Sequence, residues 1–293
     1  MPRPRRLFLH VGLPKTATTS WQVWWDTHRT ELLAQSVDYP LVETITFDPN
    51  HSAIARSMEK GDTAPLTRVL EGARAETMLL SSESFSMTAH AFSPSAIAAL
   101  RKALGDISVT CLVVFREPKS WLRSLHAQAL LNDVKPRPGF GVPLTLEEFS
   151  AQPRILRMLD HAEVAARIEA AYGGPCLQFC HEDSPFAQVC SAVGIDVMGL
   201  PEPGWRNASV SPSMTELMRQ VNGLTSDDNL RHGIIWLFRH AEPSTHTRLH
   251  NTGAPDPALW AAIRAVVAGL KPVGDDQIAL ARTLAELAQQ EIT

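Results

Sequence analysis

The stretch LFLHVGLPKTATTSWQ, residues 7–22, passes from an apolar run into a cluster of small and hydroxylated residues around one lysine. Its first part, Leu7–Val11, is short and apolar, with charged residues before it and a glycine and a proline after it, which predicts a buried strand of the parallel type. From Thr19 to about Gln35 bulky apolar side chains recur at helical spacing, which predicts a helix. A strand, a polar loop and a helix in this order are typical of parallel α/β sheets.

Two later segments repeat the order of strand and helix. TMLLSSE, residues 77–83, predicts a strand, and an alanine-rich helix follows it to Leu104. SVTCLVVFREP, residues 108–118, is rich in β-branched residues and predicts the strongest strand of the chain, followed by a helix from Pro118 to about Leu131. Further predicted elements are a loop at 132–143, a short strand at 176–179, and helices at 145–151, 160–172, 185–193, 212–224, 256–270 and 275–291.

This alternation predicts the α/β fold class, with a parallel sheet flanked by helices on both faces. We expect a single domain over residues 1–293, with its core at about 7–225 and a helical C-terminal part at about 226–293. In such sheets, ligands bind where a loop leaves the carboxyl end of a strand and opens a helix. The loop after the first strand is therefore the first candidate site.

The composition is that of an ordinary globular protein, with 44% apolar and 20% charged residues among 293. A net charge of −4 gives no overall attraction to nucleic acid or to anionic membranes, and disfavours a long polyanionic glycan as substrate. The basic start MPRPRR is followed by too short an apolar stretch for a secretory signal, and no run of 18 apolar residues occurs. We therefore expect a soluble, cytoplasmic protein whose four cysteines are free thiols.

The loop itself carries the features of an anion site. Lys15 supplies a positive charge, the start of a helix supplies unpaired backbone N–H groups, and four hydroxyls supply further donors: Thr16, Thr18, Thr19 and Ser20. The alternative is that these hydroxyls only cap the helix, which would explain one or two of them. A nucleotide-hydrolysing loop of the Walker A type is disfavoured, because the lysine comes three residues after Gly12 and no second glycine precedes it.

GLPKTATTS, residues 12–20, resembles the 5′-phosphosulfate-binding loop of sulfotransferases that use 3′-phosphoadenosine-5′-phosphosulfate (PAPS), written P-K-[ST]-G-T-[ST]. The resemblance implies that PAPS contacts the loop at Gly12, Pro14, Lys15, Thr16, Ala17, Thr18, Thr19 and Ser20. The sequence departs from the family at Ala17, where glycine is usual. If this position needs a positive φ, the methyl group costs about 1 kcal/mol or more.

VVFREPKSWLRSLHAQ, residues 113–128, resembles a second element of the same family, in which an arginine and a serine eight residues later hold the 3′-phosphate. Arg116 and Ser124 have that spacing here. Taken singly, the two residues are also explained as a surface ion pair and a solvated helix position. A weaker resemblance lies in WRNASVSPSMTELMRQVN, residues 205–222, which is similar to an R-x-N-x-S segment that precedes a helix in the bacterial members of the family. In relatives this region closes over the nucleotide. It implies contacts from Arg206, Asn207 and Ser209, although hydroxyls here also suit a helix cap.

The resemblance implies a P-loop-NTPase-like sulfotransferase fold with a helical C-terminal extension, and transfer of a sulfuryl group from PAPS to a hydroxyl or amine. Lys15 would stabilise the charge that develops on the leaving phosphate. Glu83, at the end of the strand at 77–83, is our first candidate for the base, and His51 is the second. We expect no metal, no nucleic-acid partner and no stable membrane insertion, and a small-molecule, lipid or carbohydrate acceptor. The alternatives are a P-loop kinase or other phosphotransferase, and an inactive nucleotide-binding member of the fold.

Overall fold

The computed structural model describes residues 3–41, 49–131 and 141–204, together with Thr215, Met218, Arg219, Asn222 and Gly223. The chain divides into two compact units, one of residues 1–121 with 153–207 and one of residues 122–152 with 208–293. Most of the loop predicted at 132–143, most of the helix predicted at 212–224 and the whole C-terminal part at 226–293 lie outside the described residues.

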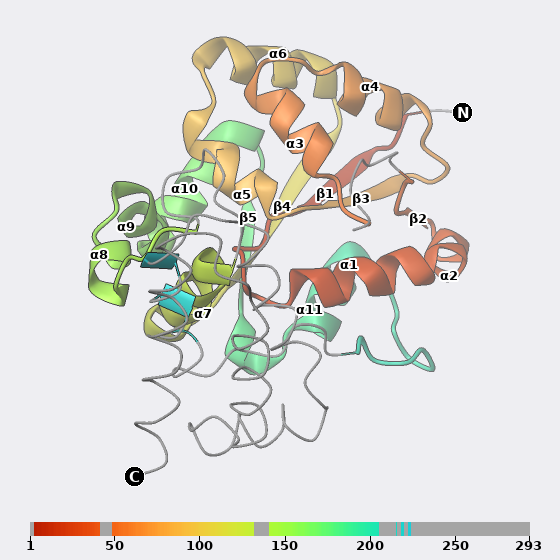
Figure 1. The fold of residues 1–293 in the computed structure, drawn as a ribbon. Helices are drawn as coiled ribbons and strands as arrows, with labels where there is room; N and C mark the ends of the chain where they lie inside the picture. The colour runs from red at the N-terminus through yellow and green to blue at the C-terminus, as the bar shows by residue number, and fades with distance from the viewer. Residues whose placement is uncertain are drawn as a thin grey trace, which may run out of the picture. The chain divides into compact units, whose positions relative to one another are not determined.

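The first unit is built on a five-stranded sheet in which all pairings are parallel (Figure 1). The strand order is β2-β3-β1-β4-β5, so β1 lies in the middle and pairs with both β3 and β4. In this register His10, the last residue of β1, is opposite Ser81 on one side and Leu112 on the other. The strands are β1 (Arg6–His10), β2 (Val37–Asp38), β3 (Thr77–Ser81), β4 (Ser108–Phe115) and β5 (Cys176–Cys180). The prediction of an α/β fold with a parallel sheet flanked by helices is thus confirmed.

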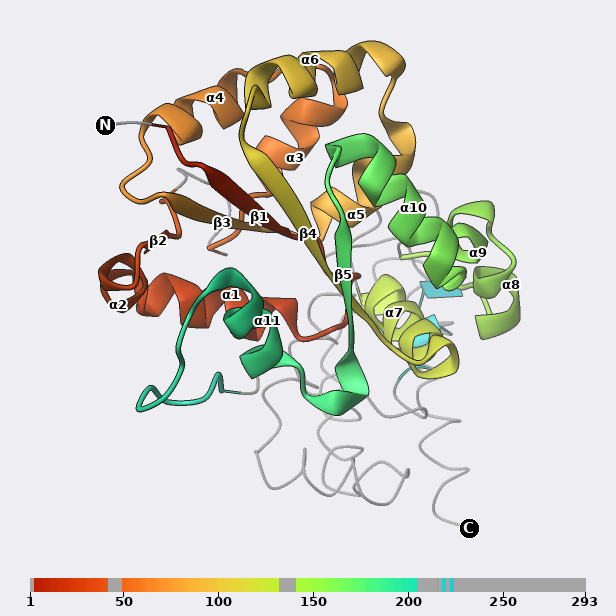
Figure 2. The same ribbon diagram turned by 180° about the vertical axis from the view of Figure 1, so that it is seen from behind.

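Helices cover both faces of this sheet (Figures 1 and 2). One face carries α1 (Thr18–Thr27), α2 (Arg29–Ala34) and α11 (Phe186–Val193). The other carries α3 (Ser52–Glu59), α4 (Ala64–Glu71), α5 (Ser84–Thr88), η1 (Ala89–Ala91), α6 (Pro94–Leu104) and α10 (His161–Tyr172). The remaining described elements are α7 (Pro118–Leu131), α8 (Leu146–Ser150), α9 (Pro153–Leu159) and η2 (His181–Asp183). No helix of the described part of the chain has the length and apolarity that a membrane span requires.

The face under α1 and α11 is an aromatic core. Trp21, Trp24 and Trp25 are buried against strand residues such as Phe8 and Leu112. Phe186 of α11 also packs here, with its ring centroid 4.9 Å from that of Trp24. The tryptophans of α1 therefore fix the helix that begins at the loop of residues 12–17 to the centre of the sheet.

The helix predicted from Thr19 to Gln35 is in fact two helices. His28 separates α1 from α2, with φ −102° and ψ 26° outside the helical range. Its Nδ1 lies 2.8 Å from the carbonyl oxygen of Trp24, and its ring stacks on the indole of the same residue. This local contact turns the chain where the apolar spacing alone predicts continuation.

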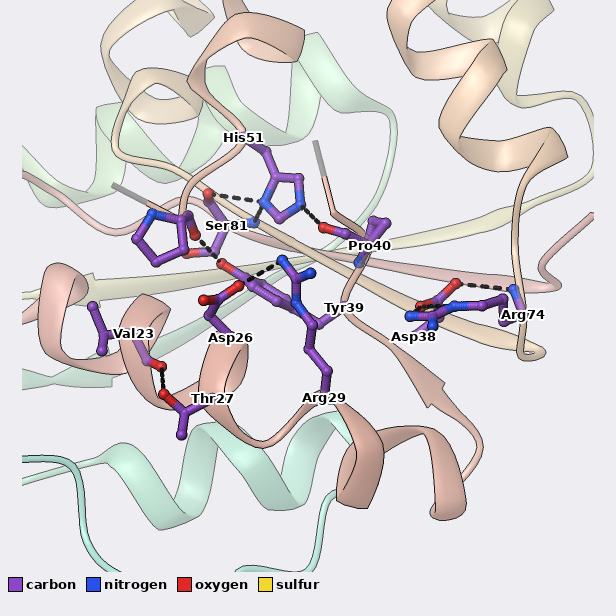
Figure 3. Close-up of polar contacts among 11 residues, drawn as sticks. Val23, Asp26, Thr27, Arg29, Asp38, Tyr39, Pro40, His51, Arg74 and Ser81 are labelled. Atoms are coloured by element: carbon purple, nitrogen blue, oxygen red, sulfur yellow. Dashed lines mark hydrogen bonds and ion pairs between the residues drawn. The ribbon is translucent and has the colours of Figure 1, made fainter. Parts of the chain in front are cut away.

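Strand β2 is short, and hydrogen bonds to a buried carboxylate hold it in place (Figure 3). Asp38 is buried and receives the backbone N–H of Arg74 at 2.9 Å and its guanidinium Nη2 at 2.7 Å. A buried carboxylate needs such charged and hydrogen-bonded partners to offset its loss of water. The pair fixes the edge of the sheet next to β3.

Gly174, just before β5, has no room for a side chain. A methyl group there would lie 2.1 Å from the carbonyl oxygen of Val109, at the start of the neighbouring strand β4. We expect Gly174→Ala to lower the free energy of unfolding by about 1–3 kcal/mol, the usual cost of overpacking. Urea unfolding measures this, with Gly204→Ala as the matched control because nothing lies within 4 Å of its added methyl group. Equal stability of the two variants would contradict the close approach of Gly174 to β4.

Candidate functional site

The strand order identifies one position at the carboxyl edge of the sheet. The chain leaves β1 toward β2 at one edge, and leaves the adjacent strand β4 toward β5 at the other edge. Ligands of open α/β sheets bind outside the carboxyl ends of the strands at such a point of divergence. The loop of residues 12–17 follows β1 and Arg116 follows β4, so both candidate segments lie at this point.

The loop of residues 12–17 has an unusual backbone. Lys15 and Ala17 have φ values of 70° and 65°, in the left-handed region that favours glycine. The positive φ on which the cost of a methyl group at residue 17 depends is therefore present. Left-handed residues next to right-handed ones turn successive N–H groups to one side and form concavities that bind anions. Two strained residues so close together indicate a loop shaped for a ligand.

Helix α1 begins in this loop without a side-chain cap. Its N-cap is Ala17, which has no hydroxyl, and its first turn holds no acidic residue. The alternative that the hydroxyls of this stretch serve only to cap the helix is therefore wrong for the N-cap position. Thr16 instead donates its hydroxyl to the carbonyl oxygen of Leu13 at 2.6 Å, inside the loop. The helix start keeps the partial positive charge that attracts anions.

Arg116 joins the end of β4 to the loop. Its Nη1 donates to the carbonyl oxygen of Lys15 at 3.1 Å, and its Nε donates to the hydroxyl of Ser120 at 3.0 Å. Trp121 makes a second connection, with its indole N–H donating to the carbonyl oxygen of Pro14 at 2.8 Å. A guanidinium has five N–H donors, so three of those of Arg116 have no partner among the described residues. They are donors held at the loop.

Glu83 reaches the same loop from the end of β3. The hydroxyl of Thr18 donates to its Oε1, and the amide of Gln22 lies 3.4 Å from its Oε2. The same amide donates to the hydroxyl of Ser81 at 3.2 Å. Glu83 is only partly buried, and a carboxylate has acceptor capacity beyond these two contacts. The carboxylate thus lies beside the start of α1.

His10 lies buried beneath the loop. Its Nδ1 is 2.8 Å from the hydroxyl of Ser81, while its Nε2 has no hydrogen-bond partner among the described residues. A methyl group on Gly12 would lie 3.2 Å from this Nε2 and 2.7 Å from the methyl group of Thr18. Glycine is therefore needed at residue 12 by close approach.

His10, Gln22 and Ser81 are residues near the loop that the sequence analysis does not predict as part of the site. The apolar neighbours of His10 and Ser81 and the helical spacing around Gln22 mark all three only as core positions.

His51, the second candidate for the base, is held by backbone on both sides (Figure 3). Its Nδ1 accepts the backbone N–H of Ser81 at 3.0 Å, and its Nε2 lies 3.2 Å from the carbonyl oxygen of Pro40. Its ring is buried and also packs edge-on against that of Tyr39. A base for an incoming substrate needs a free ring nitrogen, so this geometry favours Glu83.

Burial lowers the pKa of His10 to about 3 and that of His51 to about 4. Below pH 6.5 both histidines are protonated in the unfolded chain but remain neutral in the folded chain. The free energy of unfolding therefore falls as the pH falls from about 6.5 toward about 4. We expect each histidine to lower the free energy of unfolding by about 2 kcal/mol between pH 7 and pH 5. Urea unfolding at both pH values should show a smaller pH effect for His51→Gln than for the unchanged protein. An equal pH effect in both would contradict the burial of a neutral His51.

The other predicted contacts are placed less fully. Ser124 is partly buried on α7, within the second unit. Arg206, Asn207 and Ser209 lie outside the described residues. The roles of all four residues stay predictions.

One further polar residue, His181, follows β5 next to Arg116. The last residues of β4 and β5, Phe115 and Cys180, are register partners, so Arg116 and His181 occupy the next positions of two adjacent parallel strands. Burial lowers the pKa of the partly buried His181, the charge of Arg116 lowers it further, and Glu182 opposes both. Sequence reasoning missed this residue because its place depends on the pairing of β5 with β4.

No family model matches the chain, and no curated protein matches it. Within the part of the chain that the structure describes, no group of three or more histidine, cysteine, aspartate or glutamate side chains is arranged to hold a metal ion. The arrangement at the carboxyl edge offers an anion-binding loop, a fixed guanidinium and a carboxylate. Such a set can bind a ligand with two anionic groups and accept a proton beside it.

Proposed function

We propose that the chain is a PAPS-dependent sulfotransferase, which moves a sulfuryl group to a hydroxyl or amine of a small-molecule, lipid or carbohydrate acceptor. The observation that carries the proposal is the hydrogen bond from Arg116 to the carbonyl oxygen of Lys15. It joins the two segments that resemble the PAPS-binding elements of the family, at the point where β1 and β4 diverge. The two motifs are far apart in sequence, and their contact at this edge supports the reading of both as parts of one nucleotide site.

PAPS carries charge at both ends of its ribose, and the residues present fit both. The N–H groups of the loop and of the start of α1 suit the 5′-phosphosulfate, with the side chain of Lys15 as the cation. The unused N–H groups of Arg116 suit the 3′-phosphate, because a guanidinium offers paired donors to phosphate oxygens. The spacing of the two charges along the sheet edge would distinguish PAPS from nucleotides that lack the 3′-phosphate.

In the proposed reaction the bond from sulfur to the bridging phosphate oxygen breaks as a bond from sulfur to the acceptor oxygen or nitrogen forms. Transfers of this kind depend on positioning and on stabilisation of the leaving oxygen. Lys15 would stabilise the negative charge on the bisphosphate product, and Glu83 would take the proton of the acceptor. Thr18 and Gln22 hold this carboxylate beside the loop.

The loss of Arg116 tests the proposal directly. We expect Arg116→Ala to weaken the binding of adenosine 3′,5′-bisphosphate by about 1.5–3 kcal/mol, as for charge-assisted hydrogen bonds, and to change the binding of adenosine 5′-phosphate little. Titration calorimetry with both nucleotides measures this, and Arg101→Ala, an exposed arginine of α6, is the matched control. Equal losses for both nucleotides would contradict the assignment of Arg116. Tighter binding of ATP with Mg²⁺ than of the bisphosphate would favour a phosphotransferase instead.

A further inference from the structure

His181 follows β5 at the position next to Arg116, the residue to which we assign the 3′-phosphate. Arg116 is held by its bonds to Lys15 and Ser120, which fix the direction in which its remaining donors are presented. His181, the first residue of η2, follows β5 just as Arg116 follows β4, and its ring makes no hydrogen bond to the described residues. An anion bound to Arg116 would therefore have beside it an imidazole that can take up a proton.

The turn that carries His181 is fixed to the end of β4. The backbone N–H of Glu117 donates to Oε1 of Glu182 at 3.1 Å, and the thiol of Cys180 donates to Oε2 of the same carboxylate at 3.1 Å. The carboxylate of Glu117 is turned into the start of α7, where it accepts the backbone N–H groups of Lys119 and Ser120. Among the described residues, the charges that act on the His181 ring are those of Arg116 and Glu182.

We propose that His181 takes up a proton when the 3′-phosphate binds at Arg116, and so becomes a second cationic ligand of that phosphate. This inference rests on the proposed function. It adds His181, and the protonation of its ring, to the binding of the nucleotide. Without the nucleotide, partial burial and the cation of Arg116 keep the imidazole neutral at pH 7. A dianionic phosphate outweighs the single charge of Arg116, so the local field reverses and the protonated imidazole becomes the favoured form. Binding and protonation are then linked, and the affinity for the bisphosphate rises as the pH falls toward 6.5.

Titration calorimetry with adenosine 3′,5′-bisphosphate tests the linkage. In two buffers of different ionisation enthalpy at pH 7, we expect the unchanged protein to take up between about 0.5 and 1 more proton per nucleotide than His181→Asn. The phosphate titrates with a pKa of about 6 on its own, but this contribution is the same for both proteins and cancels in the difference. The affinity of His181→Asn should be about tenfold lower at pH 6.5 and nearly unchanged at pH 8.5.

Two further variants separate the proposal from a general effect on the fold. His90→Asn removes a histidine at an exposed position of η1, and should bind the bisphosphate with the proton uptake of the unchanged protein. His181→Lys carries its charge at every pH used, so it should bind tightly at pH 8.5 and take up fewer protons at pH 7. If the unchanged protein and His181→Asn bind the bisphosphate with equal proton uptake, the role of His181 is wrong while the proposed function stands. If the unchanged protein does not bind the bisphosphate at all, both are wrong.

Discussion

Lys15→Met is expected to lower kcat by about 10²–10³, the usual effect of losing one electrostatic stabiliser of a transition state. Methionine keeps the length of the side chain and accepts the same left-handed backbone, so the change is the loss of the ammonium group with its charge and N–H donors. The carbonyl oxygen that receives Arg116 is unchanged in the variant, so the connection between the loop and β4 persists. Turnover is measured as adenosine 3′,5′-bisphosphate released from PAPS in the presence of 4-nitrophenol as a test acceptor.

Lys119→Met is the matched control, because Lys119 is an exposed lysine in the first turn of α7. It should keep its turnover. If Lys15→Met turns over at the rate of the unchanged protein, Lys15 serves only the shape of the loop, and the charge that stabilises the leaving oxygen comes from elsewhere.

Glu83→Gln is expected to lower kcat by about 10²–10⁴ for an aliphatic alcohol acceptor, the range for losing a general base. The amide keeps the shape of the carboxylate and can still accept the hydroxyl of Thr18, so nucleotide affinity should survive. With 4-nitrophenol, which ionises near neutral pH, no base is needed and the loss should be small. The ratio of the two losses therefore reports proton abstraction and not a disturbed site.

The control for this experiment is Glu71→Gln, at the exposed end of α4. It should react with both acceptors at the rates of the unchanged protein. Equal losses of Glu83→Gln with the alcohol and with the phenol would show that Glu83 supports the site without taking the proton. Normal turnover with the alcohol would mean that the base lies elsewhere.

The sequence predicts those parts of the fold that follow from long local patterns. The apolar runs at β1, β3 and β4, each followed by a polar loop, identify the centre of the sheet, and their parallel arrangement places Lys15, Glu83 and Arg116 at one edge. That Arg116 bonds to the loop follows from the adjacency of β1 and β4, which the sequence leaves open.

The elements that sequence reasoning missed depend on tertiary contacts. Strand β2 has two residues and exists through its pairing with β3, and α3 and α4 have eight residues each, too few for an apolar period to be distinguished. The contact of Gln22 with Glu83 depends on how α1 is rotated over the sheet, which its buried tryptophans determine. Apolar spacing predicts that a helix forms, but it does not predict which strand residues the polar side chains of that helix contact.

Ser81 connects several residues of the site through hydrogen bonds, so we expect these residues to change together in evolution and not one by one. Its hydroxyl lies between His10 and Gln22, at 2.8 and 3.2 Å, and its backbone N–H is bonded to His51. A substitution at any of these positions alters the hydrogen bonds available to the others, so their effects on stability will not add. Double-mutant cycles should therefore give coupling energies of about 0.5–3 kcal/mol among His10, Gln22 and Ser81. Homologous chains should keep these residues together or replace them together.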